Sequence, residues 1–305
     1  MTDLILWSYD ASPFTQKALG MLGVKDLEWR WVETPMMPPK DDLVALTGGY
    51  RGTPVLQAGA DVYVDSQLIA RELERRFPQP TLFPAGGGLE LALVRWSDAF
   101  FRSGLKLALA LLLPQWPEPF RKDREYLFPD VDFDRVQEDF EHAKSQFRAH
   151  AALLEAQLAD GRAFLAGPSP ALADIQAYPF VWMARGAFTD LAAQLLDDLP
   201  AVVAWESRMK TVGEGRRRPI AAAEALAEAR AAAPVAAVKV DPRDAQGLRA
   251  GQSVEVCPDD TRRGAVRGEV VVATAEEIAV RRRGDDVGEV VIHFPRLGYR
   301  VDPVA

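Results

Sequence analysis

The sequence contains very little cysteine or histidine. Its 305 residues include one cysteine, Cys257, and three histidines. A single cysteine excludes an intramolecular disulfide, a zinc site built on several cysteines and a CxxC redox centre. His142, His150 and His293 show no metal-ligand spacing, so we expect no metal site. Any thiol chemistry must therefore use sulfur that arrives with another molecule.

The sequence also lacks a long apolar run and a surplus of positive charge. The longest run, residues 107–113, falls short of the ~18 residues that a membrane-spanning helix needs. The start of the chain carries Asp3 and no basic segment, which is not typical of a signal peptide. Lys and Arg number 36 against 44 Asp and Glu, a net charge of −8, which disfavours a nucleic-acid backbone as the partner. We expect a cytoplasmic protein with no membrane or nucleic-acid partner.

The length and composition are those of a globular protein. Hydrophobic residues make up 48% and charged residues 26% of the chain, the usual balance for a folded protein. At about 150 residues per domain, the length predicts two domains or one large one.

The first stretch, residues 1–80, alternates strand and helix patterns. Ser12-Pro13 is a favoured helix start, and Gly23 ends that helix. A hairpin follows around 58–60, and Asp65-Ser66 begins another helix. The predicted order is βαβαββα, with strands at 4–7, 27–32, 54–57 and 61–64 and helices at 13–23, 41–46 and 66–77.

The rest of the chain divides into a helical stretch and a β-rich tail, so the whole is expected to be an α+β multidomain protein. Residues 89–233 are predicted to be all-helical, with helices at 89–113, 133–158, 173–185, 201–212 and 220–233. Residues 235–305 are predicted to form a small barrel or sandwich with strands at 253–257, 265–273, 276–282, 289–294 and 299–301. The tail holds 11 basic and 12 acidic residues, so its arginine run at 281–283 is positive only locally.

Four short motifs occur in an order that resembles that of the glutathione S-transferase family. They are Ser12-Pro13-Phe14, the segment 52–56 (Gly-Thr-Pro-Val-Leu), Asp65-Ser66, and the segment 173–175 (Ala-Asp-Ile). The resemblance covers residues 1 to about 230 and leaves the tail outside. It implies a thioredoxin-like domain that binds glutathione, a helical domain that supplies most of the second-substrate pocket, and a homodimer.

Ser12 is the candidate for activating the glutathione thiol. A free thiol with a pKa near ~8.5 is only a few per cent ionised at neutral pH, and attack requires the thiolate. A hydroxyl at a helix start can cap the helix and also donate its proton to sulfur. Tyr9, near the end of the first strand, is the rival donor, because some classes of the family use a tyrosine there.

The resemblance also assigns the residues that would hold the rest of glutathione. It suggests a cis bond at Thr53-Pro54, with the Thr53 backbone pairing with the cysteinyl part. An edge-strand proline is the alternative. Asp65 can pair with the γ-glutamyl ammonium, while Ser66 heads a helix whose N–H groups attract a carboxylate; plain capping is the alternative. Arg51 is a weaker candidate for the glycyl carboxylate.

Aromatic residues are candidates for the pocket of an apolar second substrate. Phe14, Phe100 and Trp116 lie on the expected segments, although most aromatic residues on long helices pack in the core. Asp174 has a structural interpretation, because an acid three residues into a helix can accept from the N-cap N–H. Ala171 stands where a Ser or Thr cap is usual, so only half of that capping box is expected.

The sequence therefore predicts a glutathione transferase that conjugates the thiolate to a small apolar electrophile, as in detoxification. The alternative is a non-catalytic protein of the same fold that acts through the β-rich tail at 235–305. A glutathione-dependent oxidoreductase is disfavoured, because its mixed-disulfide chemistry needs a cysteine where Ser12 stands.

Overall fold

The computed structural model describes residues 4–260 and 264–304, and its first elements follow the predicted βαβαββα order. Residues 1–3, which include the Asp3 of the signal-peptide argument, lie outside the described residues. The elements are β1 (Ile5–Ser8), α1 (Pro13–Val24), β2 (Glu28–Glu33), α2 (Asp41–Thr47), β3 (Val55–Ala58), β4 (Asp61–Val64) and α3 (Ser66–Arg76). β1 pairs in parallel with β2 and antiparallel with β3, which pairs antiparallel with β4. This pairing confirms the expected thioredoxin-like fold.

Two units make up the chain, and both are discontinuous in sequence. We call them the mixed unit (Met1–Ala18, Leu27–Arg75 and Arg216–Ala305) and the helical unit (Leu19–Asp26 and Arg76–Gly215). Residues 216–233, which the sequence analysis assigned to the helical domain, belong to the mixed unit. The thioredoxin-like strands and the tail are therefore parts of one unit.

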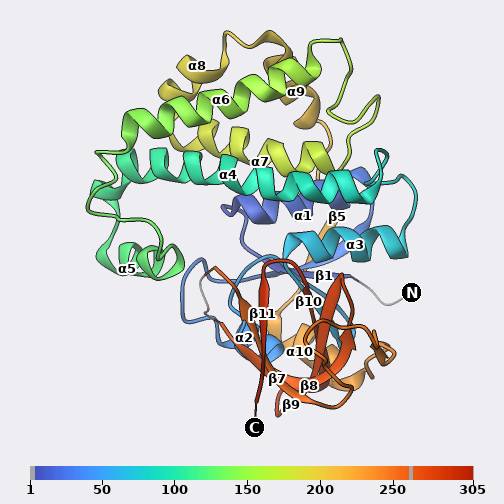
Figure 1. Cartoon of the computed structure of the whole chain (residues 1–305). Helices are drawn as coiled ribbons and strands as arrows, with labels where there is room; N and C mark the ends of the chain where they lie inside the picture. The colour runs from blue at the N-terminus through green and yellow to red at the C-terminus, as the bar shows by residue number, and fades with distance from the viewer. Residues whose placement is uncertain (1–3, 261–263, 305) are drawn as a thin grey trace. The chain divides into compact units, whose positions relative to one another are not determined.

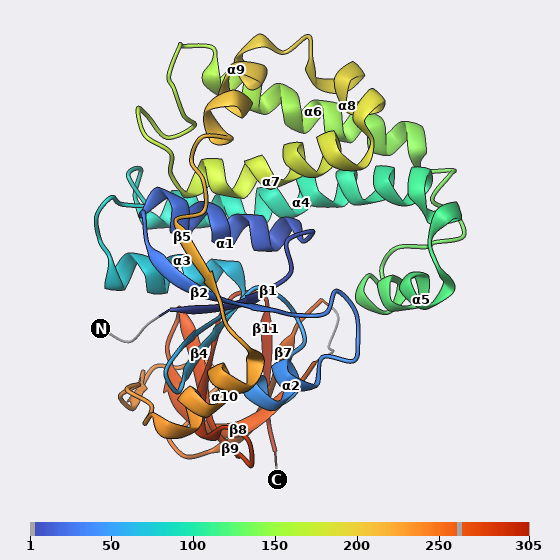
Figure 2. The same cartoon turned by 180° about the vertical axis from the view of Figure 1, so that it is seen from behind.

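The tail continues the N-terminal sheet. Its strands are β6 (Lys239–Val240), β7 (Ser253–Pro258), β8 (Val266–Ala273), β9 (Glu277–Gly284), β10 (Gly288–Pro295) and β11 (Tyr299–Pro303). β10 pairs in parallel with β4, so that Ile292 lies opposite Val62. The resulting 11-stranded sheet has the order β11-β7-β8-β9-β10-β4-β3-β1-β2-β5, with β6 beside β8. The predicted all-β tail is confirmed, and its strands curve strongly, as Figures 1 and 2 show.

A strand that the sequence analysis missed lies at the other edge of this sheet. β5 (Arg216–Pro219) pairs in parallel with β2, and Arg217 lies opposite Trp29. β5 is polar and mostly exposed, because an edge strand can carry charged residues without losing a buried face. It therefore has no apolar alternation that would have predicted it. α10 (Ala222–Ala231) follows and packs on β10.

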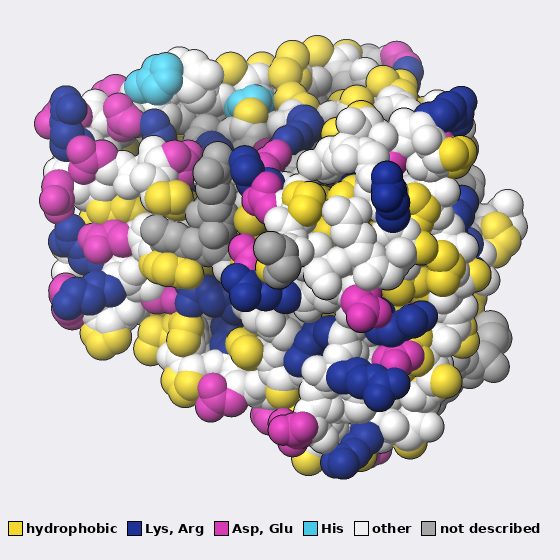
Figure 3. All heavy atoms as spheres, turned by 60° about the horizontal axis from the view of Figure 1, so that its bottom comes forward, with side chains coloured by type: hydrophobic (Ala, Val, Ile, Leu, Met, Phe, Trp, Pro, Cys, Tyr) yellow, Lys and Arg dark blue, Asp and Glu magenta, His cyan; other side chains and the backbone are white. Residues whose placement is uncertain are grey.

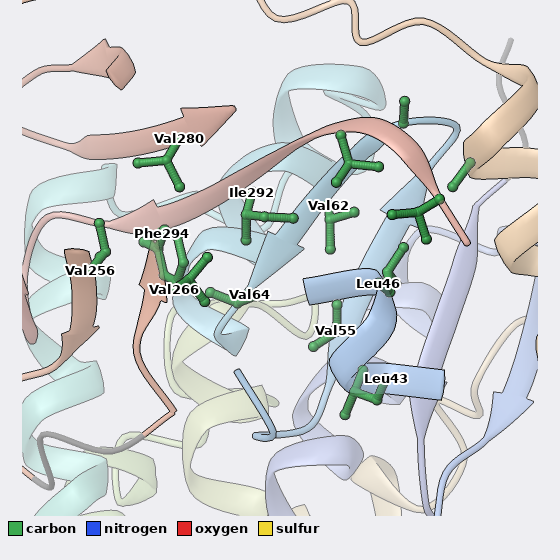
Figure 4. Packing of buried hydrophobic residues seen from close by; sticks show 14 of the residues in the cluster. Leu43, Leu46, Val55, Val62, Val64, Val256, Val266, Val280, Ile292 and Phe294 are labelled. Atoms are coloured by element: carbon green, nitrogen blue, oxygen red, sulfur yellow. The ribbon is translucent and has the colours of Figure 1, made fainter. Parts of the chain in front are cut away.

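One hydrophobic core joins the thioredoxin-like strands to the tail. Leu43 of α2, Val55 of β3, Val62 of β4, and Ile292 and Phe294 of β10 are buried in the same cluster. Figure 4 shows the side chains of this cluster gathered from these elements. Burial of such side chains is the main favourable contribution to folding. The thioredoxin-like part therefore depends on the tail for a share of its own core.

Polar contacts of the arginine run at 281–283 also tie the tail to the N-terminal elements. The Arg282 Nη1 donates to the carbonyls of Ala45, at 2.8 Å, and Leu46, at 3.2 Å. These carbonyls lie in the last turn of α2, where a cation is favourable. Arg283 pairs with Glu289 at 2.9 Å. On the face shown in Figure 3, basic and acidic side chains are interspersed. The run thus has structural partners within the mixed unit.

The helical unit is built mainly from α-helices, of which α4 has 26 residues and α8 has 8. Its elements are α4 (Gly87–Leu112), η1 (Leu113–Gln115), α5 (Glu118–Leu127), α6 (Phe140–Leu158), α7 (Leu172–Ala187), α8 (Thr189–Leu196) and α9 (Pro200–Met209). The sequence analysis missed α5 and α8 and started α6 too early, at residue 133. No helix in the described part of the chain combines the length and apolarity needed to cross a membrane.

Asp174, near the start of α7, has the structural role that the sequence predicts. Its carboxylate is buried and accepts from the Ala171 N–H at 3.1 Å, the expected half of the capping box. It also accepts from the Leu165 N–H at 2.8 Å and the Trp205 Nε1 at 2.7 Å. The missing serine or threonine cap is thus offset by two further donors.

Candidate functional site

The strand register brings three of the sequence motifs to the same edge of the sheet. Val55, at the start of β3, lies opposite Trp7 of β1 and opposite Val64 of β4. The segments that follow β1, precede β3 and follow β4 therefore converge. These segments carry Ser12, Thr53-Pro54 and Asp65-Ser66.

Ser12 caps the N-terminus of α1 and is buried. Its Oγ accepts from the Thr15 N–H at 3.3 Å, and its carbonyl accepts from the Gln16 N–H at 3.1 Å. The predicted capping role is confirmed. Tyr9, the rival donor, is half-buried, and the Lys40 Nζ lies 5.2 Å from the centroid of its ring. The two residues thus have different surroundings, because Ser12 caps a helix and the ring of Tyr9 lies beside a cation.

The loop before β3 contains the predicted cis bond. The Thr53–Pro54 peptide is cis, Pro54 is buried and Thr53 is half-buried. Arg51 is also half-buried, and its carbonyl accepts from the Lys40 Nζ at 3.3 Å. Lys40 therefore lies between Tyr9 and this loop and adds a positive charge to the edge where the motifs meet.

Asp65 and Ser66 form the N-terminus of α3. The Asp65 Oδ1 accepts from the Gln67 N–H at 2.9 Å, and the Asp65 carbonyl accepts from the N–H groups of Leu68 and Ile69. Ser66 is buried. Asp65 has a φ of 73°, a conformation that costs energy for most residues and is more tolerated by Asp and Asn. Asp65 thus caps α3 as expected, and its second oxygen faces other groups.

The tail supplies one of the groups near that second oxygen. The Tyr299 hydroxyl of β11 lies 3.3 Å from the Asp65 Oδ2 and 3.3 Å from the hydroxyl of Tyr50. Burial raises the pKa of Asp65, while the Gln67 N–H, the charge of Lys17 and the Tyr299 hydroxyl oppose that rise. Burial also raises the pKa values of both tyrosines, so they are protonated at neutral pH.

The tail also closes over the loop between α2 and β3. Gly49 has a φ of 141°, and a Cβ at this position would lie 2.4 Å from the Ala265 carbonyl oxygen. A side chain is excluded there both by the backbone conformation and by this close approach. The start of β8 is thereby held against the loop that leads to Thr53.

The three aromatic residues expected in the second-substrate pocket have different surroundings. Phe14 is half-buried, with the Lys17 Nζ 4.9 Å from its ring centroid. Trp116 is half-buried and packs edge-on against Phe120 at 4.8 Å. Phe100 is fully buried, with Phe147 at 4.9 Å and Phe180 at 5.7 Å between ring centroids. Phe100 is therefore a core residue of the helical unit and does not line a pocket.

An open hollow in the mixed unit lies at the carboxyl ends of β1 and β2. Its volume is about 520 Å³, and it is lined by Tyr9, Asp10, Ala11, Glu33, Thr34, Pro35 and Met36. The carboxyl ends of parallel strands are the usual location of ligand sites in open α/β sheets. The hollow thus begins beside Tyr9, directly before the segment that carries Ser12.

A second polar cluster joins the tail to β4. The imidazole of His293 is buried between the Glu277 Oε1, 2.6 Å from its Nδ1, and the Asp61 Oδ1, 3.1 Å from its Nε2. Its ring stacks on Tyr63 at 4.4 Å between centroids. Burial lowers the pKa of His293, but the two carboxylates outweigh burial and the net pKa is raised. In the described residues, no group of His, Cys, Asp and Glu is arranged to hold a metal ion.

Comparisons with known proteins agree with the motifs. The family model described as glutathione S-transferase, N-terminal domain, matches residues 6–81, and that of the C-terminal domain matches residues 137–208. A GST-like protein from Pseudomonas syringae is 35% identical, with 100% of both chains covered and a TM-score of 0.80. The chain belongs to the glutathione S-transferase family. Because that match covers both chains completely, it includes the tail of this glutathione S-transferase family member.

More distant structures share the fold over less of the chain. A glutathione S-transferase of Ceriporiopsis subvermispora in complex with glutathione is 19% identical, covers 69% of this chain and 97% of its own, and has a TM-score of 0.55. A tau-class glutathione S-transferase from mango is 19% identical, with 69% and 92% covered and a TM-score of 0.53. A β-etherase from Sphingobium is 22% identical, with 70% and 98% covered and a TM-score of 0.52. Comparison with curated proteins gave no match.

Sequence reasoning missed several charged and polar residues around the site. Lys17 is fully buried although it is a lysine, and its sequence signal is that it is the one charged residue of α1. Lys40, Tyr50 and Tyr299 carry no local pattern. Tyr299 is 234 residues from Asp65, so only the fold places it beside this motif.

Proposed function

We propose that this protein is a glutathione transferase in which the Ser12 hydroxyl stabilises the glutathione thiolate for attack on an apolar electrophile. The observation that carries the proposal is the position of Ser12. Its oxygen accepts from the Thr15 N–H at the start of α1. A hydroxyl that accepts such a bond still has its own proton to donate to sulfur.

The free energy needed to lower the thiol pKa is comparable to what Ser12 and the N-terminus of α1 contribute. Lowering a thiol pKa by two units needs about 2.7 kcal/mol of preference for the anion. A hydrogen bond to a charged group contributes about 1.5–3 kcal/mol, and a helix N-terminus contributes about 0.3–1 kcal/mol. Together the two contributions span about 1.8–4 kcal/mol, a range that includes the requirement.

The other motifs are proposed to hold the remaining parts of glutathione. The Thr53 backbone, beside Pro54, pairs with the cysteinyl part as an added strand would. Asp65 receives the γ-glutamyl ammonium, and the N-terminus of α3 at Ser66 receives the adjacent carboxylate. Arg51 binds the glycyl carboxylate. The support for this placement is that the strand register brings these segments together.

In the proposed reaction, the thiolate sulfur forms a bond to an electrophilic carbon. The leaving group departs with its electron pair, or an activated double bond takes up a proton after addition. The electrophile is proposed to occupy the hollow beside Tyr9 and Met36, with Phe14 as a further apolar candidate. Detoxification, a cytoplasmic location and a homodimer are part of the proposal, and their support is family membership.

The test is the pKa of the bound thiol in the variant Ser12→Ala. Loss of a hydrogen bond worth about 1.5–3 kcal/mol raises that pKa by about 1–2 units. The thiolate absorbance of bound glutathione, titrated from pH 5 to 10, measures the change. Tyr9→Phe is the matched control, because it removes the rival hydroxyl and leaves the N-terminus of α1 intact.

The outcomes separate the two hydroxyls. A thiol pKa within about half a unit of wild type in Ser12→Ala would show that Ser12 is not the activating residue. A shift in Tyr9→Phe alone would assign the role to Tyr9. Conjugation assays with a panel of aromatic halides and activated alkenes then identify the class of electrophile.

The alternative, a non-catalytic protein that acts through the tail, stays a prediction. Deleting residues 235–305 does not test it cleanly, because the deletion removes β10 from its pairing with β4 and opens the shared core. Exposed substitutions on the tail are a better test. Loss of a partner complex with conjugation unchanged would favour the alternative.

A further inference from the structure

Tyr299 reaches the glutathione motif from the last strand of the chain. Its hydroxyl lies 3.3 Å from the Asp65 Oδ2, and its ring centroid lies 5.5 Å from that of Phe294. Phe294 is fully buried and also packs edge-on against Tyr50 at 6.4 Å. Phe294 thus contacts the rings of both tyrosines, and these contacts restrict the position of the Tyr299 side chain.

The two carboxylate oxygens of Asp65 contact groups from different elements, α3 and β11. The Oδ1 accepts from the Gln67 N–H within α3. The Tyr299 hydroxyl of β11 lies 3.3 Å from both the Oδ2 and the Tyr50 hydroxyl, and its single proton goes to the Oδ2 when Tyr50 donates to the Tyr299 oxygen. Two donors on two oxygens fix the plane of the carboxylate, and each oxygen keeps a further lone pair for another donor. Asp65 and Tyr299 are both partly buried residues.

We propose that Tyr299 is a positioning residue that orients the Asp65 carboxylate toward the ammonium group of the γ-glutamyl end of glutathione. The inference rests on the proposed function. It assigns to the tail a part in ligand recognition that residues 1–230 do not supply. The Tyr299 hydroxyl acts in two ways, by fixing the carboxylate plane and by stabilising the ionised form that binds a cation.

The experiment compares two ligands that differ only in the ammonium group. Glutathione and glutaryl-cysteinyl-glycine, which lacks the α-amino group, are titrated by calorimetry into wild type and Tyr299→Phe. Wild type is expected to prefer glutathione, and Tyr299→Phe to lose about 3–10-fold of that preference, since the bond to a charged acceptor is long. A general loss of packing would weaken both ligands equally and leave the preference unchanged.

Two further variants make the result specific. Asp65→Asn is expected to abolish the preference, and adding Tyr299→Phe to it should then have no further effect on the preference. Arg300→Gln is the matched control, because Arg300 is the next residue on β11 and its side chain is about half exposed. It should leave the preference at the wild-type value.

The pH dependence supplies a readout that a purely structural role would not move. Protonation of Asp65 ends ammonium binding at low pH. Loss of the Tyr299 hydrogen bond removes one of the groups that oppose the raised pKa of Asp65. The pH below which the preference for glutathione is lost should therefore be higher in Tyr299→Phe than in wild type.

The possible failures are distinguishable. Wild-type protein that binds neither ligand, or both equally, overturns the proposed glutathione recognition and this inference with it. A wild-type preference that survives Tyr299→Phe unchanged overturns the inference alone. So does an effect of Tyr299→Phe on the preference that persists in the Asp65→Asn background.

Discussion

Ile292→Ala is expected to destabilise the thioredoxin-like strands together with the tail. Ile292 belongs to β10 in the tail, is fully buried, and lies opposite Val62 of β4 in the shared core. Truncating a buried isoleucine to alanine costs about 2–5 kcal/mol, and Ile292→Val costs about 0.5–1.5 kcal/mol. Because one core and one sheet span both parts, the same free energy should be lost in each.

Hydrogen exchange followed by mass spectrometry measures this loss strand by strand. Under conditions where exchange reports the opening free energy, peptides of β1 and β3 should lose protection by the same amount as peptides of β8 to β10. Ile292→Val should lower protection by less, and again by equal amounts in the two sets of peptides. Arg283→Ala, whose side chain is 82% exposed on the neighbouring β9, should change protection by less than about 0.5 kcal/mol.

The reasoning would be refuted by an uncoupled result. If β8 to β10 lose protection in Ile292→Ala while β1 and β3 keep theirs, the tail opens as an independent body. The shared core would then contribute nothing to the stability of the thioredoxin-like strands, and the tail would be a removable module.

Two further predictions concern buried polar groups. The raised pKa of His293 means that its bonds to Asp61 and Glu277 stabilise the fold fully below the ordinary histidine pKa of about 6.5 and lose that effect as the pH rises through the raised value. Urea unfolding between pH 6 and 9 should show this decline in wild type and not in His293→Gln. Asp174→Ala leaves three donors without an acceptor and should lower the free energy of unfolding by about 3–5 kcal/mol, against about 1.5–3 kcal/mol for Trp205→Phe; equal losses in urea unfolding would contradict this account.

Local patterns predicted most of the elements and the placement of the motifs on them. The Ser12-Pro13 pair marked the start of α1, and Val-rich segments marked β7 to β11 to within a few residues. The cis bond at Thr53–Pro54 followed from the family motif. Each of these features depends on residues that are near neighbours in sequence.

The remaining features depend on contacts between residues that are distant in sequence. Nothing local indicates that β10 pairs with β4, or that the arginines of β5 form an edge strand. The pairing of Tyr299 with Asp65 is of the same kind. The local pattern around Phe100 also could not decide its role, because an aromatic residue on a long helix has the same pattern in a core and in a pocket.

The discontinuous mixed unit has a consequence for protein synthesis. The thioredoxin-like strands leave the ribosome first, but the strands that complete their core follow the whole helical unit. Between Arg76 and Tyr299 the ribosome needs about 10–45 s at the usual elongation rates. During that interval the apolar side chains of β3 and β4 cannot pack against β10. We expect the nascent chain to bind chaperones through this exposed apolar surface. The helical unit, whose last residue precedes β5, is free to fold before the sheet closes.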